Sequence, residues 1–102
     1  MRHKKIYIAG KVSGMEKEAE VLFARAKAYL SHQFPGAEIV NPLKLNHDHD
    51  KEWSSYMRVC LAELCTCDTI ALIPNWSNSR GACIELDVAA VIGCKIIHLE
   101  TY

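Results

Sequence analysis

The sequence predicts one α/β domain over residues 1–102, a doubly wound parallel sheet of about four strands with flanking helices. Three observations lead to this prediction. Four short apolar runs alternate along the chain with three longer segments that are helical in pattern. The connections between them are short and contain Gly, Pro and Asn. Because β–α–β crossovers are right-handed in nearly all proteins, this alternation favours a parallel sheet covered by helices.

The predicted strands are short, apolar and bounded by turn-forming residues, as buried strands are. They are Lys5–Ala9, Glu38–Val40, Thr69–Ile73 and Cys94–Leu99. We interpret the first of these runs as the central strand of the sheet.

The first and third predicted helices are bounded by clear stop signals. Glu16–Ser31 repeats its apolar residues at steps of three and four positions, and Pro35-Gly36 breaks the pattern. Leu86–Ile92 ends at Gly93, a residue that commonly terminates helices.

The second predicted helix runs from about Lys51 to Cys65, with Asp48 or Asp50 as its N-cap. It carries a broad apolar face, formed by Trp53, Tyr56, Met57, Cys60, Leu61 and Leu64. One short helix needs less apolar surface than this against a four-stranded sheet. We therefore expect part of the face to form a homodimer or a higher homo-oligomer.

Composition argues against several classes of partner. The chain has 12 Lys plus Arg and 12 Asp plus Glu, so its formal net charge is zero and no nucleic-acid partner is expected. No apolar run reaches the roughly 18 residues of a membrane span, and no signal peptide precedes the domain, so no membrane partner is expected. The five cysteines lie mostly in apolar contexts, which suits reduced thiols in a cytoplasmic protein.

Two short clusters invite a metal interpretation, which the spacing does not favour. Cys65-Thr66-Cys67 lacks the CxxC spacing of zinc sites and has no second pair. His47-Asp48-His49-Asp50 alternates its ligands in a polar loop, where helix initiation is the more common role. We therefore predict no metal and no cofactor.

The polar stretch Asn75–Glu85 is the most informative part of the chain. It follows the strand Thr69–Ile73, and ligands of open α/β sheets bind at the carboxyl ends of strands. Glu85 falls near the start of the following helix, which favours its ionised form, and an ionised carboxylate in a polar cleft can act as a nucleophile. Tyr7, near the end of the first strand, could hold that carboxylate. The residues alone leave open that Glu85 is only a helix charge and Tyr7 only core.

A second loop, formed by Gly10, Lys11, Val12, Ser13 and Gly14, should meet the first at the same edge of the sheet. Its backbone N–H groups precede a helix and could hold an anion, typically a phosphate. The loop has neither a Walker sequence nor a GxGxxG fingerprint. A purely structural role for its two glycines also remains open.

Several short motifs occur in a fixed order along nearly the whole chain. They are Ile6-Tyr7-Ile8-Ala9-Gly10, Asn41-Pro42, Trp53, Tyr56-Met57, Leu61, Leu64, Cys67-Asp68, Leu72, Pro74, Trp76, Ser79-x-Gly81-Ala82-x-x-Glu85 and Ala89. This pattern resembles the nucleoside 2-deoxyribosyltransferase-like superfamily, in particular its small bacterial and phage branch. The resemblance implies a flavodoxin-like fold that binds a small-molecule nucleoside or nucleotide. The S-x-G-x-x-x-E element is its most specific part.

The resemblance also implies catalytic roles. The residue matching Glu85 is the nucleophile that attacks C1′ of the deoxyribose and displaces the nucleobase, and water or a second base then resolves the glycosyl-enzyme. The residue matching Tyr7 orients this nucleophile. Cys60 stands where the superfamily has an Asp that protonates the departing base, and a thiol is a weak acid for this task.

Further residues are implied in substrate binding. Ser79 would contact the sugar or its phosphate, with Trp76 and Gly81 in the same loop. The segment Gly10–Gly14 would bind a 5′-phosphate. In the active enzymes a neighbouring subunit's C-terminal segment completes each site, and this chain stops at Tyr102.

Two functions follow from this resemblance. The first is N-glycosidic bond cleavage or exchange on a 2′-deoxynucleoside or its 5′-monophosphate. The alternative is a catalytically impaired nucleotide- or sugar-phosphate-binding module. Cys60 separates them: if it lies at the mouth of the site, its thiol is a weak acid, so base release should be slow and Cys60→Asp should increase it. If Cys60 is instead a buried helix residue, Asp at this position would unfold the protein.

Overall fold

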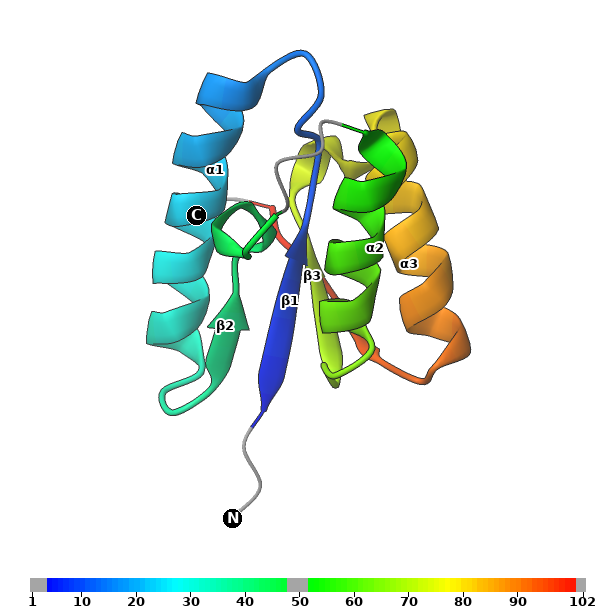
Figure 1. The fold of residues 1–102 in the computed structure, drawn as a ribbon. Coiled ribbons are helices and arrows are strands. Elements are labelled where there is room, and N and C mark those ends of the chain that lie inside the picture. The colour runs from blue at the N-terminus through cyan, green and yellow to red at the C-terminus, as the bar shows by residue number, and fades with distance from the viewer. Residues whose placement is uncertain (1–3, 48–51, 101–102) are drawn as a thin grey trace.

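The computed structural model describes residues 4–47 and 52–100, which form a four-stranded parallel sheet between two layers of helices (Figure 1). The strands are β1 (Lys5–Ala9), β2 (Glu38–Val40), β3 (Thr69–Leu72) and β4 (Lys95–His98), in the order β2-β1-β3-β4. The predicted parallel α/β sheet with a central first strand is therefore confirmed.

The helices divide between the two faces of the sheet. Helix α1 (Glu16–Gln33) covers one face, and α2 (Trp53–Leu64) and α3 (Arg80–Val91) lie side by side on the other (Figure 1). Alternating side chains of β1 feed the two cores. Ile6 and Ile8 pack in the cluster that contains the α1 residue Phe23, while Tyr7 and Ala9 pack in the cluster on the face of α2 and α3.

The third helix begins earlier than its apolar pattern predicts. It starts at Arg80 instead of Leu86, because the Ser79 hydroxyl oxygen accepts the Ala82 N–H at 3.1 Å and caps the helix there. The residues before it form a short 3₁₀ helix, η2 (Pro74–Asn78), instead of an open loop. Glu85 therefore lies in the second turn of α3.

The apolar face of helix α2 is only partly buried. Met57, Cys60 and Leu64 are buried, Tyr56 and Leu61 are half-buried, and Trp53 is 40% exposed. The core and the cavity described below use most of this face, and self-association stays a prediction. The predicted caps Asp48 and Asp50 and the predicted start at Lys51 lie outside the described residues.

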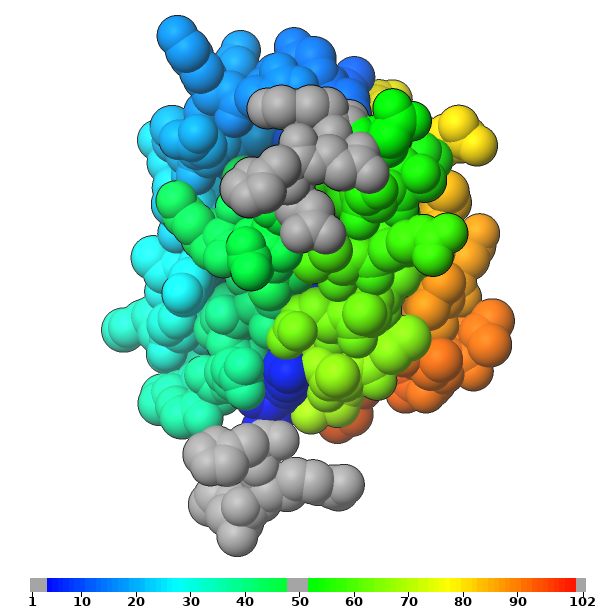
Figure 2. Space-filling model, in the orientation of Figure 1, coloured from blue at the N-terminus to red at the C-terminus, as the bar shows by residue number. Residues whose placement is uncertain are grey.

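Tight packing at the carboxyl end of β1 positions the loop that follows it. A Cβ atom added to Gly10 would lie 2.9 Å from the Cβ of Ile73, so only glycine lets the two segments approach this closely. In the space-filling view, the segment after β1 and the first turns of α2 both reach the upper rim of the molecule (Figure 2). None of the helices in residues 4–47 and 52–100 has the length and apolar character needed to cross a bilayer.

Candidate active site

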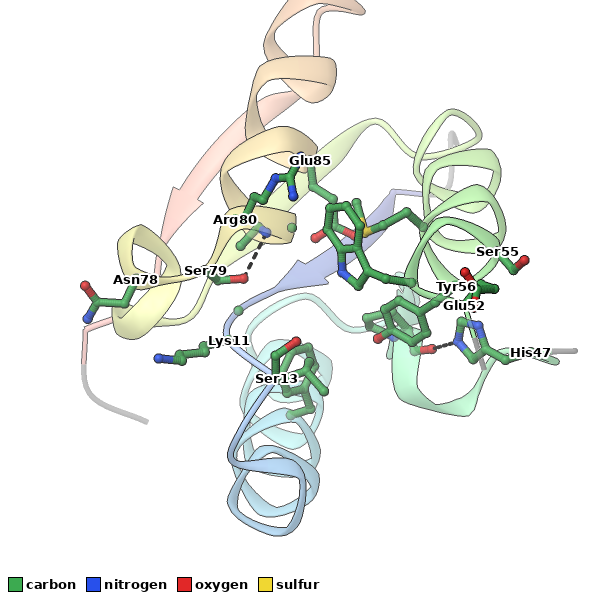
Figure 3. A pocket seen from close by; sticks show the side chains of 18 residues that line it. Lys11, Ser13, His47, Glu52, Ser55, Tyr56, Asn78, Ser79, Arg80 and Glu85 are labelled. Atoms are coloured by element: carbon green, nitrogen blue, oxygen red, sulfur yellow. Dashed lines mark hydrogen bonds between the residues drawn. The ribbon is translucent and has the colours of Figure 1, made fainter. Parts of the chain in front are cut away.

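A cavity of about 640 Å³ opens at the carboxyl end of the sheet. It lies between the loop after β1, the start of α2 and the start of α3 (Figure 3). Its walls are formed by Gly10, Lys11, Val12, Ser13, Phe23, Pro42, His47, Glu52, Trp53, Ser55, Tyr56, Met57, Asn78, Ser79, Arg80, Gly81, Ala82 and Glu85. This is the edge at which parallel α/β sheets bind ligands.

Glu85 is a buried carboxyl on the wall of this cavity. It is 6% exposed, and the hydroxyl of the fully buried Tyr7 donates a hydrogen bond to its Oε2 at 2.5 Å. Burial raises the pKa of Glu85 to about 7, while the hydrogen bond from Tyr7 acts to lower it. Near neutral pH the group is therefore divided between its acid and carboxylate forms. Such a carboxyl can serve as a nucleophile or as a base.

Cys60 does not line the cavity. It is fully buried on α2, and the neighbouring hydroxyls of Tyr7 and Tyr56 act to lower the pKa of its thiol. Burial raises the pKa of the thiol to about 11. An acid for the leaving base would have to lie at the mouth of the site. The fold instead buries Cys60 in the core. The reason is that Cys60 packs with Leu64 and Tyr7 in the core, whereas Met57 of the same helix reaches the cavity.

The loop after β1 contributes four of its five predicted residues to the cavity, namely Gly10, Lys11, Val12 and Ser13. Two of its backbone N–H groups already have partners. The Lys11 N–H donates to Asn75 Oδ1 at 3.0 Å, and the Gly14 N–H donates to Glu16 Oε2 at 3.2 Å. Gly14 itself does not appear among the lining residues. The loop thus has fewer N–H groups to offer an anion than its sequence suggests.

The segment at the start of α3 is split between cavity and core. Ser79 and Gly81 line the cavity, and a Cβ on Gly81 would lie 3.3 Å from the sulfur of Met57. Trp76, predicted to bind substrate, lies outside the cavity. Its ring is 6.2 Å from the ring of His98, and it packs against the core on this face. Trp76 lies within the short 3₁₀ helix η2, which was predicted to be an open loop.

The sequence interpretation missed an aromatic wall that faces the loop after β1. His47 stacks on Tyr56 with ring centroids 4.3 Å apart, and its Nε2 lies 2.8 Å from the carbonyl oxygen of Pro42. On the same side, the guanidinium of Arg80 lies 4.8 Å above the ring of Trp53. The spacing of Trp53 and Tyr56 on one helix face was the available signal, but we interpreted that face as core with part of it left for a subunit contact.

The charges around the cavity are mixed. Lys11 and Arg80 supply positive charge, and Glu52 and Glu85 supply carboxyls. Within residues 4–47 and 52–100, no group of three or more His, Cys, Asp or Glu side chains is arranged to hold a metal ion. Three residues of the candidate ligand cluster, Asp48, His49 and Asp50, lie outside that range.

The fold and the cavity define a flavodoxin-like α/β domain with a cavity at the carboxyl edge of its sheet. Residues 4–98 match the family described as "Domain of unknown function (DUF4406)", and the chain belongs to that family. No curated protein sequence matches the chain.

Two solved structures are similar to this one. The 2-desoxiribosyltransferase from Leishmania mexicana is 18% identical with a TM-score of 0.70, and the match covers 97% of this chain and 65% of that protein. The 2-deoxyribosyltransferase from Bacillus psychrosaccharolyticus is 18% identical with a TM-score of 0.68, covering 92% and 70%. The chain thus spans about two thirds of the length of these proteins. The likeness confirms the deoxyribosyltransferase-like fold that the sequence pattern predicts.

Proposed function

We propose that this protein cleaves the N-glycosidic bond of a 2′-deoxynucleoside or its 5′-monophosphate, with Glu85 as the nucleophile. One observation carries the proposal: a buried carboxyl, oriented by a tyrosine hydroxyl at 2.5 Å, on the wall of a cavity large enough for a nucleotide. The similar solved structures are named as 2-deoxyribosyltransferases, which supports this class of substrate.

The reaction uses the ionised form of Glu85. The carboxylate oxygen bonds to C1′ of the sugar as the bond from C1′ to the base nitrogen breaks, and the electron pair leaves with the base. Water or a second base then attacks C1′ and frees Glu85, so hydrolysis and transfer share the first step. Tyr7 positions the carboxylate through its hydrogen bond and does not itself react.

The distribution of side chains around the cavity favours a nucleotide over a nucleoside. Lys11 and Ser79 lie on one side of the cavity in the close-up, and Tyr56 and His47 lie on the other (Figure 3). Positive charge suits a 5′-phosphate, and flat aromatic rings suit a nucleobase. A 2′-deoxynucleoside 5′-monophosphate would span the two ends and present its C1′ near the middle.

The second candidate is a nucleotide- or sugar-phosphate-binding module without catalysis. The burial of Cys60 favours it, because the position that the resemblance assigns to the acid does not line the cavity. A positioned acid contributes about 10²–10⁴-fold to rate, so a site lacking one could bind substrate and release base very slowly.

Chromatography of free base separates the two candidates. The protein is incubated with the four common 2′-deoxynucleoside 5′-monophosphates and with their nucleosides, in parallel with Glu85→Gln. The enzyme predicts base release that increases as pH rises through about 7, where Glu85 ionises, and that is lost in Glu85→Gln. A monophosphate that raises the melting temperature without releasing base would favour the binding module. Base release undiminished in Glu85→Gln would refute the nucleophile assignment.

A further inference from the structure

The side chain of Asn75 connects the two segments that border the cavity near Lys11. Asn75 lies in η2, and its Oδ1 accepts the backbone N–H of Lys11 at 3.0 Å, although the two residues are 64 positions apart. Its Nδ2 lies 3.9 Å from the sulfur of Met15. One amide group therefore contacts the segment between β1 and α1 near both of its ends.

This contact extends the pairing of β1 with β3 by means of a side chain. At the end of the paired region, the Ile73 N–H donates to the Ala9 carbonyl at 2.9 Å. The Ile73 carbonyl then accepts the Trp76 N–H at 2.9 Å as the chain turns into η2. Lys11 lies beyond this turn, where the Asn75 amide supplies the acceptor that its backbone N–H needs.

The contact is also closely packed. A Cβ atom added to Gly10 would lie 3.3 Å from Asn75 Oδ1, so the amide oxygen lies close to the backbone of the loop. Asn75 and Lys11 are both half-buried. Water therefore competes less for this hydrogen bond than it would at an exposed site.

Asn75 affects the cavity through Lys11. Asn75 is not among the residues that line the cavity, but Lys11 is, and in the close-up Lys11 and Ser79 lie on the same side of it (Figure 3). Within residues 4–47 and 52–100, Lys11 forms no ion pair. An anionic ligand would therefore not have to displace a carboxylate of these residues from its ammonium group.

We infer that Asn75 is a positioning residue of the proposed site. A lysine side chain has a long flexible stem, so a fixed backbone narrows the space that its ammonium group samples. By holding the N–H of Lys11, Asn75 places that ammonium group to contact the 5′-phosphate of a bound 2′-deoxynucleoside monophosphate. The inference rests on the monophosphate substrate of the proposed function, and it does not depend on catalysis.

A double-mutant cycle on binding tests this inference. Every protein in the cycle is the full chain carrying Glu85→Gln, so that bound nucleotide is not cleaved during the titration. Calorimetry gives the dissociation constant of the tightest-binding monophosphate among dAMP, dGMP, dCMP and dTMP for the parent, Asn75→Ala, Lys11→Met and the double variant. Asn75→Ala should weaken binding about 3–10-fold, the effect of losing about one hydrogen bond, when Lys11 is present. It should have no effect beside Lys11→Met, where no ammonium group remains to be positioned.

Further variants and a second measurement control the cycle. Ser77→Ala changes an exposed residue of the same η2 and should leave binding unchanged. Amide hydrogen exchange should become faster at the Lys11 N–H in Asn75→Ala and stay unchanged at the N–H of Tyr7, in the buried part of β1. Asn75→Asp keeps an acceptor and should keep the Lys11 amide protected. Asn75→Leu, which is similar in shape but has no acceptor, repeats the cycle if Asn75→Ala does not fold.

The outcomes that overturn the inference are distinct. Binding by Asn75→Ala at the parent affinity would overturn it, and so would exchange at the Lys11 amide equal to that of the parent. An equal loss of affinity with and without the Lys11 ammonium group would make the role of Asn75 structural. If no monophosphate binds, or if Lys11→Met binds like the parent, the phosphate contact is absent and the inference fails. Monophosphates that bind the wild-type protein without release of base would refute the proposed catalysis and leave the cycle to decide on Asn75.

Discussion

The buried carboxyl of Glu85 should make the stability of this protein depend on pH. Glu85 is 6% exposed, and burial raises its pKa from the ordinary 4.5 to about 7, against the lowering effect of the Tyr7 hydrogen bond. The unfolded chain releases this proton near pH 4.5, while the folded protein keeps it until about pH 7. Between these values the folded state binds more protons, so the free energy of unfolding falls as pH rises.

The size of this effect follows from the difference between the two pKa values. Each pKa unit corresponds to about 1.4 kcal/mol, so ionisation of Glu85 costs the folded state about 3 kcal/mol once the pH is well above 7. Glu85→Gln has nearly the same shape, keeps an oxygen that can accept from Tyr7, and cannot ionise. From pH 4 to pH 9, the wild-type protein should lose about 3 kcal/mol of stability relative to this variant.

Urea unfolding at several pH values, followed by tryptophan fluorescence, measures this difference. All other titrating groups are shared by the two proteins, so their contributions cancel in the comparison. Glu18→Gln, at an exposed position on α1, is the matched control. If the wild-type and Glu85→Gln curves stay parallel to within about 0.5 kcal/mol, the size of an ordinary surface substitution, the pKa of Glu85 is not raised by burial.

Three further predictions test the surroundings of the site. Tyr7→Phe removes the hydrogen bond that lowers the pKa of Glu85, so any base release should begin at higher pH, and an unchanged pH–rate profile would contradict this. Ser79→Ala should cost about 1 kcal/mol in urea unfolding by removing the cap of α3, whereas Ser77→Ala on the exposed part of η2 should cost little. Cys60→Asp should cost on the order of 3–5 kcal/mol by burying an unpaired carboxylate, and a wild-type unfolding midpoint would contradict this.

The arrangement of the sheet could be predicted from the sequence because it depends on local patterns. Apolar runs such as Lys5–Ala9 and Glu38–Val40 are strands with the predicted bounds. Their parallel order follows from the helices between them and from the handedness of the crossovers. The resemblance placed Tyr7 beside Glu85, and the two residues, 78 positions apart in the chain, are in contact. Their catalytic roles stay predictions.

The sequence prediction differed from the structure where one local pattern is compatible with more than one conformation. The apolar period of the third helix begins at Leu86, but its start is fixed at Arg80 by one hydrogen bond from the Ser79 side chain. The resemblance implied a substrate contact for Trp76, but the ring of Trp76 lies beside that of His98 and does not line the cavity. The Ser79 cap and the η2 turn leave the hydrophobic pattern of the sequence unchanged, so that pattern could not reveal them.

The sequence by itself determined the class of fold, and it pointed to the edge of the sheet at which the cavity opens and to the carboxyl of Glu85 on its wall. The tertiary structure alone decided what surrounds that carboxyl. The helical period of α2 shows that Tyr56 and Cys60 share a face, but the docking of that face buries Cys60 and leaves Tyr56 on the cavity with His47 stacked on it. Burial of a side chain depends on contacts between distant segments, and the raised pKa of Glu85 depends on burial, so neither follows from the order of residues alone.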